Sequence, residues 1–181
     1  MTLKEFKEAV LKFIEEYDTA ESTLTKDVDI ATKINSTINN KMFEIMRYKK
    51  IEAKEEVDVS ENEEMEFSDI DENMYQLNKI IGIKYEQIGK YIKFLENGTA
   101  TVYYYKYPKR IKDDTDGDRY KFELDPEALE VMKIGVAADL LKTDVSNRFG
   151  QIWDNEYQRL LQTLDSRKTG GIIIIGEGVD V

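Results

Sequence analysis

The chain has 181 residues, of which 41% are hydrophobic and 35% are charged, and its formal net charge is −11 at pH 7. It contains neither cysteine nor histidine, which excludes disulfides, zinc sites built on those residues, thiol nucleophiles and a histidine general base. No apolar run is long enough to predict a membrane span, and residues 1–20 do not resemble a signal peptide. The acidic balance argues against binding of nucleic acid through phosphate neutralisation.

Two helices are predicted at the start of the chain. Thr2 and Glu5 have capping-box spacing, and apolar residues recur at helical intervals from about Leu3 to Tyr17. A second apolar stripe over 30–46 predicts a helix that ends near residue 50. Asn39 lies within this second helix, and the sequence leaves open whether its amide has a buried polar role.

A strongly acidic window follows. It contains eleven acids and a single lysine, a net charge of −10, so the other 160 residues together carry −1. The acids are Glu52, Glu55, Glu56, Asp58, Glu61, Glu63, Glu64, Glu66, Asp69, Asp71 and Glu72. This composition favours a solvated, partly disordered loop. The alternative is an ordered surface whose negative charge has a function.

The middle of the chain is predicted to form an antiparallel sheet. The clearest signal is a hairpin of Lys90–Leu95 and Thr99–Tyr107 joined at Glu96-Asn97-Gly98, because Asn-Gly between β-prone runs is typical of hairpins. Pro108 lacks a backbone donor and is expected to end the second strand. Further strands are predicted at 51–59, 65–67 and 121–124, and 76–85 is either a strand or a short helix leading into one.

The tyrosine-rich run at the end of this hairpin has two interpretations. Tyr103, Tyr105 and Tyr107 share one face of the predicted strand, with Tyr104 on the other. Tyrosines beside basic residues can stack on single-stranded bases. Since the chain lacks a basic groove, packing within the sheet is the favoured interpretation.

The segment Asp113, Asp114, Thr115, Asp116, Gly117, Asp118 partly matches a calcium-binding EF-hand loop, with Glu123 in the last ligand position. Lys112, however, occupies the first ligand position, and the flanks do not read as helices. A polar turn is therefore favoured. The same acids are a poor basis for a metal-dependent hydrolase, because no second cluster accompanies them.

Two more helices are predicted near the end. Asp125-Pro126-Glu127 is typical of a helix start, and the helix that follows contains Gly135, Ala137 and Ala138, which permit close approach of a neighbour. A final helix carries an apolar stripe from Phe149 to Leu164 and ends before Gly170-Gly171. We expect residues 1–50 and 125–168 to form one bundle, with 51–124 inserted as a β subdomain.

The last residues are predicted to form an extended arm over 169–181. Four consecutive isoleucines follow Gly171, and two valines follow a second glycine-rich stretch. Burial of the four isoleucines is worth about 6–12 kcal/mol as an upper bound. The isoleucine run therefore either joins its own sheet or adds to a partner's edge, and the partner is favoured. The docking residues are Gly171, Ile172, Ile173, Ile174, Ile175, Val179 and Val181.

The sequence from about Tyr91 to Asp165 resembles the head-to-tail connector (adaptor, or neck) proteins of tailed bacteriophages. The motifs are Tyr107-Pro108, Leu124-Asp125-Pro126-Glu127-Ala128-Leu129, the run from Val136 to Asp144, and the final helix with Tyr157. The resemblance implies an α+β fold: a helical bundle from both chain ends, an inserted antiparallel β-sheet subdomain and an extended C-terminal arm.

The resemblance also implies a structural role rather than an enzyme, with no cofactor or metal. Similar proteins form rings, commonly of twelve copies, that bind the portal and the next neck or tail protein while DNA passes without specific binding. We therefore expect a virion protein that is in the host cytoplasm during assembly. Its acidic channel-facing surface would comprise Glu55, Glu56, Asp58, Glu61, Glu63, Glu64 and Glu66. A tail-completion or stopper protein of the same neck, or a cytosolic interaction module, is the alternative.

Overall fold

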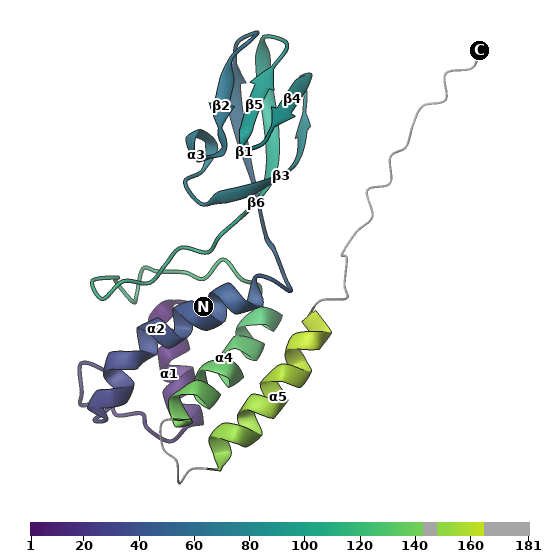
Figure 1. The fold of residues 1–181 in the computed structure, drawn as a ribbon. Helices are drawn as coiled ribbons and strands as arrows, with labels where there is room; N and C mark the ends of the chain where they lie inside the picture. The colour runs from purple at the N-terminus through teal and green to yellow at the C-terminus, as the bar shows by residue number, and fades with distance from the viewer. Residues whose placement is uncertain (143–147, 165–181) are drawn as a thin grey trace.

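The computed structural model of the chain describes residues 1–142 and 148–164. Within them the chain has the predicted α+β fold: helices from both chain ends pack together, and two small antiparallel sheets stand at one end of the bundle (Figure 1). The bundle helices are α1 (Leu3–Phe13), α2 (Val28–Ile45), α4 (Pro126–Leu141) and α5 (Phe149–Leu164). The inserted elements are β1 (Ile51–Val59), β2 (Glu64–Glu66), α3 (Phe67–Ile70), β3 (Met74–Ile81), β4 (Tyr85–Ile88), β5 (Tyr91–Phe94) and β6 (Gly98–Lys106).

The first two helices form where predicted but end earlier. The Thr2 and Glu5 side chains cap α1 reciprocally, as the capping-box spacing predicted. The helix stops at Phe13 rather than near Tyr17, because Glu15 adopts a left-handed backbone with φ 64°. Similarly, α2 begins after its cap Asp27 and ends at Ile45, several residues short of the predicted end.

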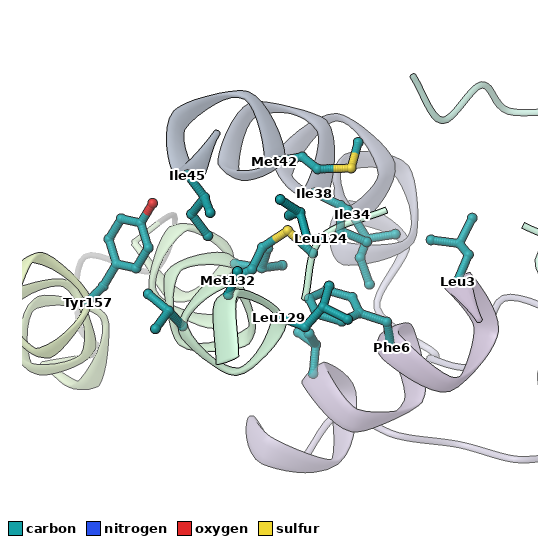
Figure 2. Packing of buried hydrophobic residues seen from close by; sticks show 14 of the residues in the cluster. Leu3, Phe6, Ile34, Ile38, Met42, Ile45, Leu124, Leu129, Met132 and Tyr157 are labelled. Carbon is teal, nitrogen blue, oxygen red and sulfur yellow. The ribbon is translucent and has the colours of Figure 1, made fainter. Parts of the chain in front are cut away.

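Helix α4 lies in the centre of the bundle (Figure 2). Asp125 caps it by accepting a hydrogen bond from the Ala128 amide, and Pro126 opens it, as predicted. Buried residues occur all around α4 because α1, α2 and α5 each pack against it. On α5, Tyr157, Leu161 and Leu164 are buried, whereas Ile152 of the predicted apolar stripe is 55% exposed.

A buried lysine also joins three of the helices. Lys41 of α2 is only 6% exposed, and its Nζ lies 3.1 Å from carboxylate oxygens of both Glu44 and Asp139. The same ammonium lies 4.4 Å from the ring centroid of Tyr157 on α5. Two carboxylates and an aromatic face thus compensate the cost of burying this charge.

The acidic window is folded, so the loop interpretation is wrong. Residues 52–72 form most of β1, all of β2 and the short helix α3. Alternation explains this order: Ile51 and Val59 are buried, while the glutamates of β1 face solvent. Pairing along the whole length of β6, from Ile51↔Lys106 to Val59↔Gly98, satisfies one edge of β1.

The predicted hairpin of 90–95 with 99–107 is also wrong. Strand β6 pairs with β1 and β3 in one sheet of order β1-β6-β3, while β5 pairs with β2 and β4 in a second sheet of order β2-β5-β4. Both edges of β6 are therefore occupied. The tight hairpin is β4–β5, whose turn contains Gly89 at φ +62°. Asn97 and Gly98 instead carry the chain from one sheet to the other.

The two sheets enclose a core of their own. Nine buried residues form it, including Phe67 of α3, Phe94 of β5 and Val102 of β6. The bundle core is larger and contains Ile51 at the start of β1 but no other strand residue. The β subdomain therefore has a separate hydrophobic core, and β6 ends before Pro108, as predicted.

The segment after β6 returns to the bundle. Ile111 and Leu124 belong to the bundle core, and Tyr120 and Phe122 pack against it. The Asn39 amide of α2 donates to the Ile111 carbonyl at 2.7 Å and accepts from the Ile111 amide at 2.8 Å. The predicted strand at 121–124 does not form; Lys121 makes only an isolated bridge with Thr2. The sheets therefore end at residue 106, and 107–124 covers the helices.

Candidate assembly surfaces

No three acidic side chains of the described residues are placed to hold one metal ion. Two of the four acids in 113–118 form local contacts instead. Asp116 accepts from the amides of Asp118 and Arg119 and forms an ion pair with Arg119 at 3.3 Å. Asp118 forms an ion pair with Lys4 of α1 at 3.2 Å. The Asp118–Lys4 ion pair attaches the segment to the bundle, and the Asp116 contacts order the segment itself.

The acidic window lies on the surface of the β subdomain. Of the seven residues predicted to face a channel, Glu55, Glu56, Asp58, Glu61 and Glu64 are exposed, and Glu63 and Glu66 are half-buried. Among all eleven acids of the window, only Asp71 forms an ion pair with another described residue. The other ten form a field of carboxylates without cationic partners.

A hollow of about 630 Å³ lies where the β subdomain meets the bundle. Its lining residues are Phe43, Glu72, Asn73, Tyr107, Pro108, Lys109, Arg110 and Lys112. The Tyr107 ring lies 4.6 Å from Tyr75 and 5.9 Å from Phe43, and the Arg110 guanidinium lies 4.9 Å from the Phe43 ring centroid. The hollow therefore joins aromatic faces to three cationic side chains, with Glu72 as its one acid.

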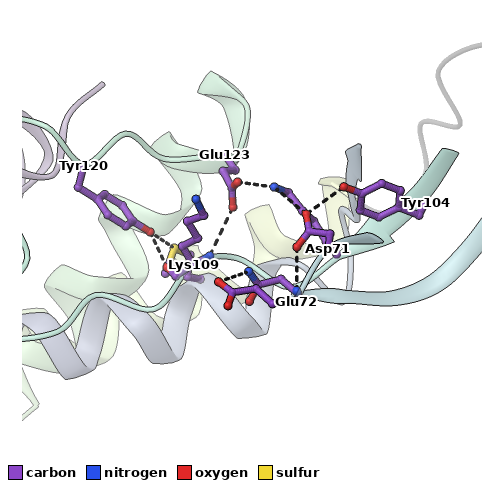
Figure 3. A network of polar contacts seen from close by, with 9 residues as sticks. Asp71, Glu72, Tyr104, Lys109, Tyr120 and Glu123 are labelled. Carbon is purple, nitrogen blue, oxygen red and sulfur yellow. Dashed lines mark hydrogen bonds and ion pairs between the residues drawn. The ribbon is translucent and has the colours of Figure 1, made fainter. Parts of the chain in front are cut away.

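A polar network fixes this junction (Figure 3). Tyr104, buried in β6, donates to Asp71 at 2.9 Å, and Lys106 donates to Glu123 at 2.6 Å while lying 3.7 Å from Asp71. Tyr120 donates to the Lys109 carbonyl at 2.6 Å. These bonds tie the end of β6 to the segment before β3 and to the segment before α4.

The network perturbs the acidity of its members. Burial opposes ionisation of Asp71, but hydrogen bonds from the Asn73 amide and the Tyr104 hydroxyl, together with the charge of Lys106, outweigh burial and lower the Asp71 pKa. Burial, reinforced by the charge of Glu123, raises the pKa of Tyr120 to about 12. The Asp71 carboxylate is thus held ionised and the Tyr120 hydroxyl is held protonated.

The tyrosine faces of β6 are covered by the chain's own lysines. Lys50 lies 4.5 Å from the Tyr105 ring centroid, and Lys79 lies 4.7 Å from that of Tyr103. Tyr104 is buried on the opposite face. These contacts support packing within the subdomain over base stacking at Tyr103 and Tyr105, whereas Tyr107 remains 44% exposed in the hollow.

The small residues of α4 are used inside the chain. A Cβ placed on Gly135 would lie 2.6 Å from the Tyr157 ring, so α5 packs directly on the glycine backbone. Ala137 and Ala138 are fully buried or nearly so. Gly135 therefore serves the α4–α5 contact, and the burial of all three positions leaves them no surface for another subunit. The docking arm, Gly171 to Val181, lies outside the described residues.

Searches with the sequence found no matching protein-family model and no matching curated protein. Among the described residues, no helix has both the length and the apolar character needed to span a bilayer.

Sequence reasoning missed the junction. It identified Asp71 and Glu72 only as members of the acidic window, it noted only that basic residues accompany the tyrosine run, and it did not connect Phe43 of α2 with Tyr107. No local signal could have done so, because these residues come from three separate segments. The basic composition of 106–112, which has four cations and no acid, was the available hint.

Proposed function

We propose that this protein is a structural head-to-tail connector of a tailed bacteriophage. It would form a ring beneath the portal, extend the DNA channel and join the head to the neck or tail. The observation that carries the proposal is the combination of the motifs over 91–165 with a bundle of both chain ends and an inserted antiparallel β subdomain. The α+β fold agrees with the one that the resemblance implied, and the C-terminal arm lies outside the described residues.

The exposed carboxylates are consistent with a conduit. A wall that carries unpaired negative charge repels phosphates and does not retain passing DNA. We assign the acidic surface from Glu55 to Glu66 to the channel or its rim. DNA would pass without specific binding, and the protein would be a virion component of the neck.

The C-terminal arm is assigned to docking on the portal or on a neighbouring copy, on sequence alone. Main-chain ladder bonds would supply affinity, and alternate side chains of Ile172–Ile175 would fill pockets of the partner. Such an arm adds little to the stability of the isolated subunit, because ordering each residue costs about 1–2 kcal/mol, which is comparable to the gain from isoleucine burial.

The test is reconstitution with purified portal particles, followed by native mass spectrometry and electron microscopy. The full chain should add a closed ring to the portal. A chain that lacks Ile172–Val181 should fold with nearly unchanged stability but fail to attach, and replacement of the four isoleucines by serine, which keeps the length, should fail likewise. A full chain that stays monomeric and ignores portals would contradict the proposal and favour an interaction module.

A further inference from the structure

The first sheet of the β subdomain has an acidic edge. In the order β1-β6-β3, strand β1 forms one edge and β3 forms the other. Glu52, Glu55 and Glu56 are exposed along β1, and none of them forms an ion pair with a described residue. Glu55 belongs to the inner face by alternation and is nevertheless exposed, which an open edge explains.

The hollow lies on the other side of the same sheet. The Tyr107 amide, directly after β6, donates to the Asn73 carbonyl, directly before β3, and the Tyr107 ring contacts Tyr75 of β3. Lys109, Arg110 and Lys112 line this side, and none of them is within ion-pair distance of a described carboxylate. Even with Glu72 included, the hollow keeps an excess of positive charge.

We propose that the hollow of each copy receives the β1 edge of a second copy, so that Glu52, Glu55 and Glu56 of one protomer meet Lys109, Arg110 and Lys112 of the next. The inference rests on the proposed ring and specifies its lateral contact. The exposed Tyr107 ring, together with Phe43 beneath Arg110, supplies the apolar part of the contact. Glu55 and Glu56 would then belong to the lateral contact, and the unpaired charge that borders the channel would come from Asp58 to Glu66.

A second copy fits better than the chain itself because of the sheet geometry. The three strands span about 10 Å between the β1 and β3 edges, and the two edges face opposite ways. In the described structure none of the β1 carboxylates is within ion-pair distance of Lys109, Arg110 or Lys112. Two copies placed side by side in the same orientation can make this contact, because each copy has the acidic β1 edge on one side and the basic hollow on the other. Two different complementary surfaces per subunit are what a closed ring of head-to-tail contacts requires.

A nucleic-acid strand is the main competitor for the hollow, since phosphates would also suit three cations and bases could stack on Tyr107. The neighbouring charge argues against it. Glu72 lies within the hollow, and the ten unpaired carboxylates of the acidic window belong to the same subdomain. A partner that carries a dense line of phosphates would meet repulsion, whereas the edge of a single strand brings only a few carboxylates.

The experiment uses two full-length charge-reversal variants. The first carries Glu52→Lys, Glu55→Lys and Glu56→Lys, and the second carries Lys109→Glu, Arg110→Glu and Lys112→Glu. A control variant reverses Glu15, Glu16 and Glu21, which are also exposed and lie just after the C-terminal end of α1. Circular dichroism checks folding, and sedimentation at 50 mM and 500 mM salt measures association of each variant and of their mixture. A labelled single-stranded oligonucleotide probes the hollow.

Each reversal variant should associate about tenfold to a thousandfold more weakly than the wild type, and the control variant should associate normally. Mixing the two reversal variants should restore assembly, because each then meets a complementary edge. Wild-type association should weaken at 500 mM salt.

Four results would overturn the inference: association unaffected by the reversals, no rescue in the mixture, a wild type that stays monomeric at 50 mM salt, or oligonucleotide binding lost only in the second variant while assembly is unchanged. The connector function is judged separately, by attachment to portals.

Discussion

The helical bundle and the β subdomain neutralise their acidic side chains differently. In the bundle, carboxylates lie beside cations of the same or a neighbouring helix, as in the pairs of Glu8 with Lys12, Asp139 with Lys41 and Asp154 with Lys142. In the acidic window of the subdomain, Asp71 is the one acid that forms an ion pair with another described residue. Many acids of the bundle thus have a cationic partner within the chain, whereas ten of the eleven acids in the window of the subdomain have none among the described residues.

The two regions also differ in how they are held together. The bundle core draws on all four long helices and the segment 107–124, whereas the subdomain core is smaller and lies between two three-stranded sheets. Small sheets with a limited core contribute little surplus stability. The comparison suggests that the bundle supplies the stability of the chain and the subdomain supplies its charged surface. Five predictions test this division.

The largest effects should come from the two cores. Phe6 of α1 and Phe94 of β5 are both almost completely buried, each in a different core. Truncation of either to alanine should cost about 3–5 kcal/mol. Phe6→Ala should destabilise the whole chain, while Phe94→Ala should unfold the sheets and leave the helices protected. Hydrogen exchange followed by mass spectrometry locates each loss.

Loss of protection throughout the chain in both variants would contradict the separation of the cores. The helical circular dichroism signal gives a second check, because Phe94→Ala should leave it nearly intact at a temperature where the sheets have lost protection.

The next effect concerns the segment 107–124, which the structure assigns to the bundle. Asn39→Ala removes both hydrogen bonds to Ile111 and leaves two backbone groups without partners, so we expect a loss of about 1–3 kcal/mol. Asn40→Ala is the matched control, because Asn40 is exposed on the same helix. Urea unfolding of both variants measures the difference. Equal stabilities would show that the anchor contributes nothing.

Features that depend on neighbouring residues could be predicted from the sequence, and contacts between distant segments could not. The start of α4 was predictable because Asp125, Pro126 and Glu127 act within one helical turn. The partner of β6 was not, because β1 begins more than forty residues before it and the Asn97-Gly98 signal favoured a local hairpin. The acidic window was predicted to be a loop because its composition indicates repulsion between like charges. Composition does not show the alternation along β1 that buries Ile51 and Val59.

The acidic window and the hollow differ in the same way in how well the sequence predicted them. The sequence could predict that the acids from Glu55 to Glu64 lie at a surface, since a high density of like charge is not buried. The hollow was not, because it depends on the contact of Phe43 with Tyr107 and Arg110 across about 65 residues of sequence. The role of Gly135 was predictable in kind, as a site of close packing, but its partner Tyr157 on α5 was not.

A smaller effect is expected at the α4–α5 contact. In Gly135→Ala the new methyl group would overlap the Tyr157 ring, and overpacking typically costs 1–3 kcal/mol, partly offset by about 1 kcal/mol of improved helix propensity. We expect a net loss of up to about 2 kcal/mol in thermal or urea unfolding. Combining it with Tyr157→Leu should cost less than the two single changes added together. Strict additivity would show that the ring is not what the methyl group meets.

Acid should act mainly at the junction and at the α4 cap. Burial would raise the pKa values of Asp71 and Asp125, but other contacts outweigh it and lower both. For Asp71 these are hydrogen bonds from the Asn73 amide and Tyr104 together with Lys106, and for Asp125 they are the hydrogen bonds from Lys49 and the Ala128 amide. A depressed native pKa contributes stability that is complete above the unfolded-state value of about 3.9 and is lost as pH falls through the native value. Stability should therefore decline below about pH 4.

Asp71→Asn should flatten that acid dependence while lowering stability at pH 7. Asp125→Asn separates charge from capping, because asparagine still caps a helix. The free energy of unfolding is measured between pH 3 and pH 7. If it depends on pH as steeply in both variants as in the wild type, these two carboxylates are not the source of the acid dependence.

The smallest expected effect is that of calcium, which we expect to leave the stability of the chain unchanged. Asp116 accepts amide hydrogen bonds and pairs with Arg119, and Asp118 pairs with Lys4 of α1, so binding an ion would disrupt contacts that attach this segment to the bundle. Lys112 also places a cation where a first calcium ligand would stand. The measurement is the melting temperature at millimolar calcium, with magnesium at the same concentration as the control. A rise seen with calcium alone would show that residues 113–118 form an ion site, and the segment could no longer be regarded as a simple covering of the helices.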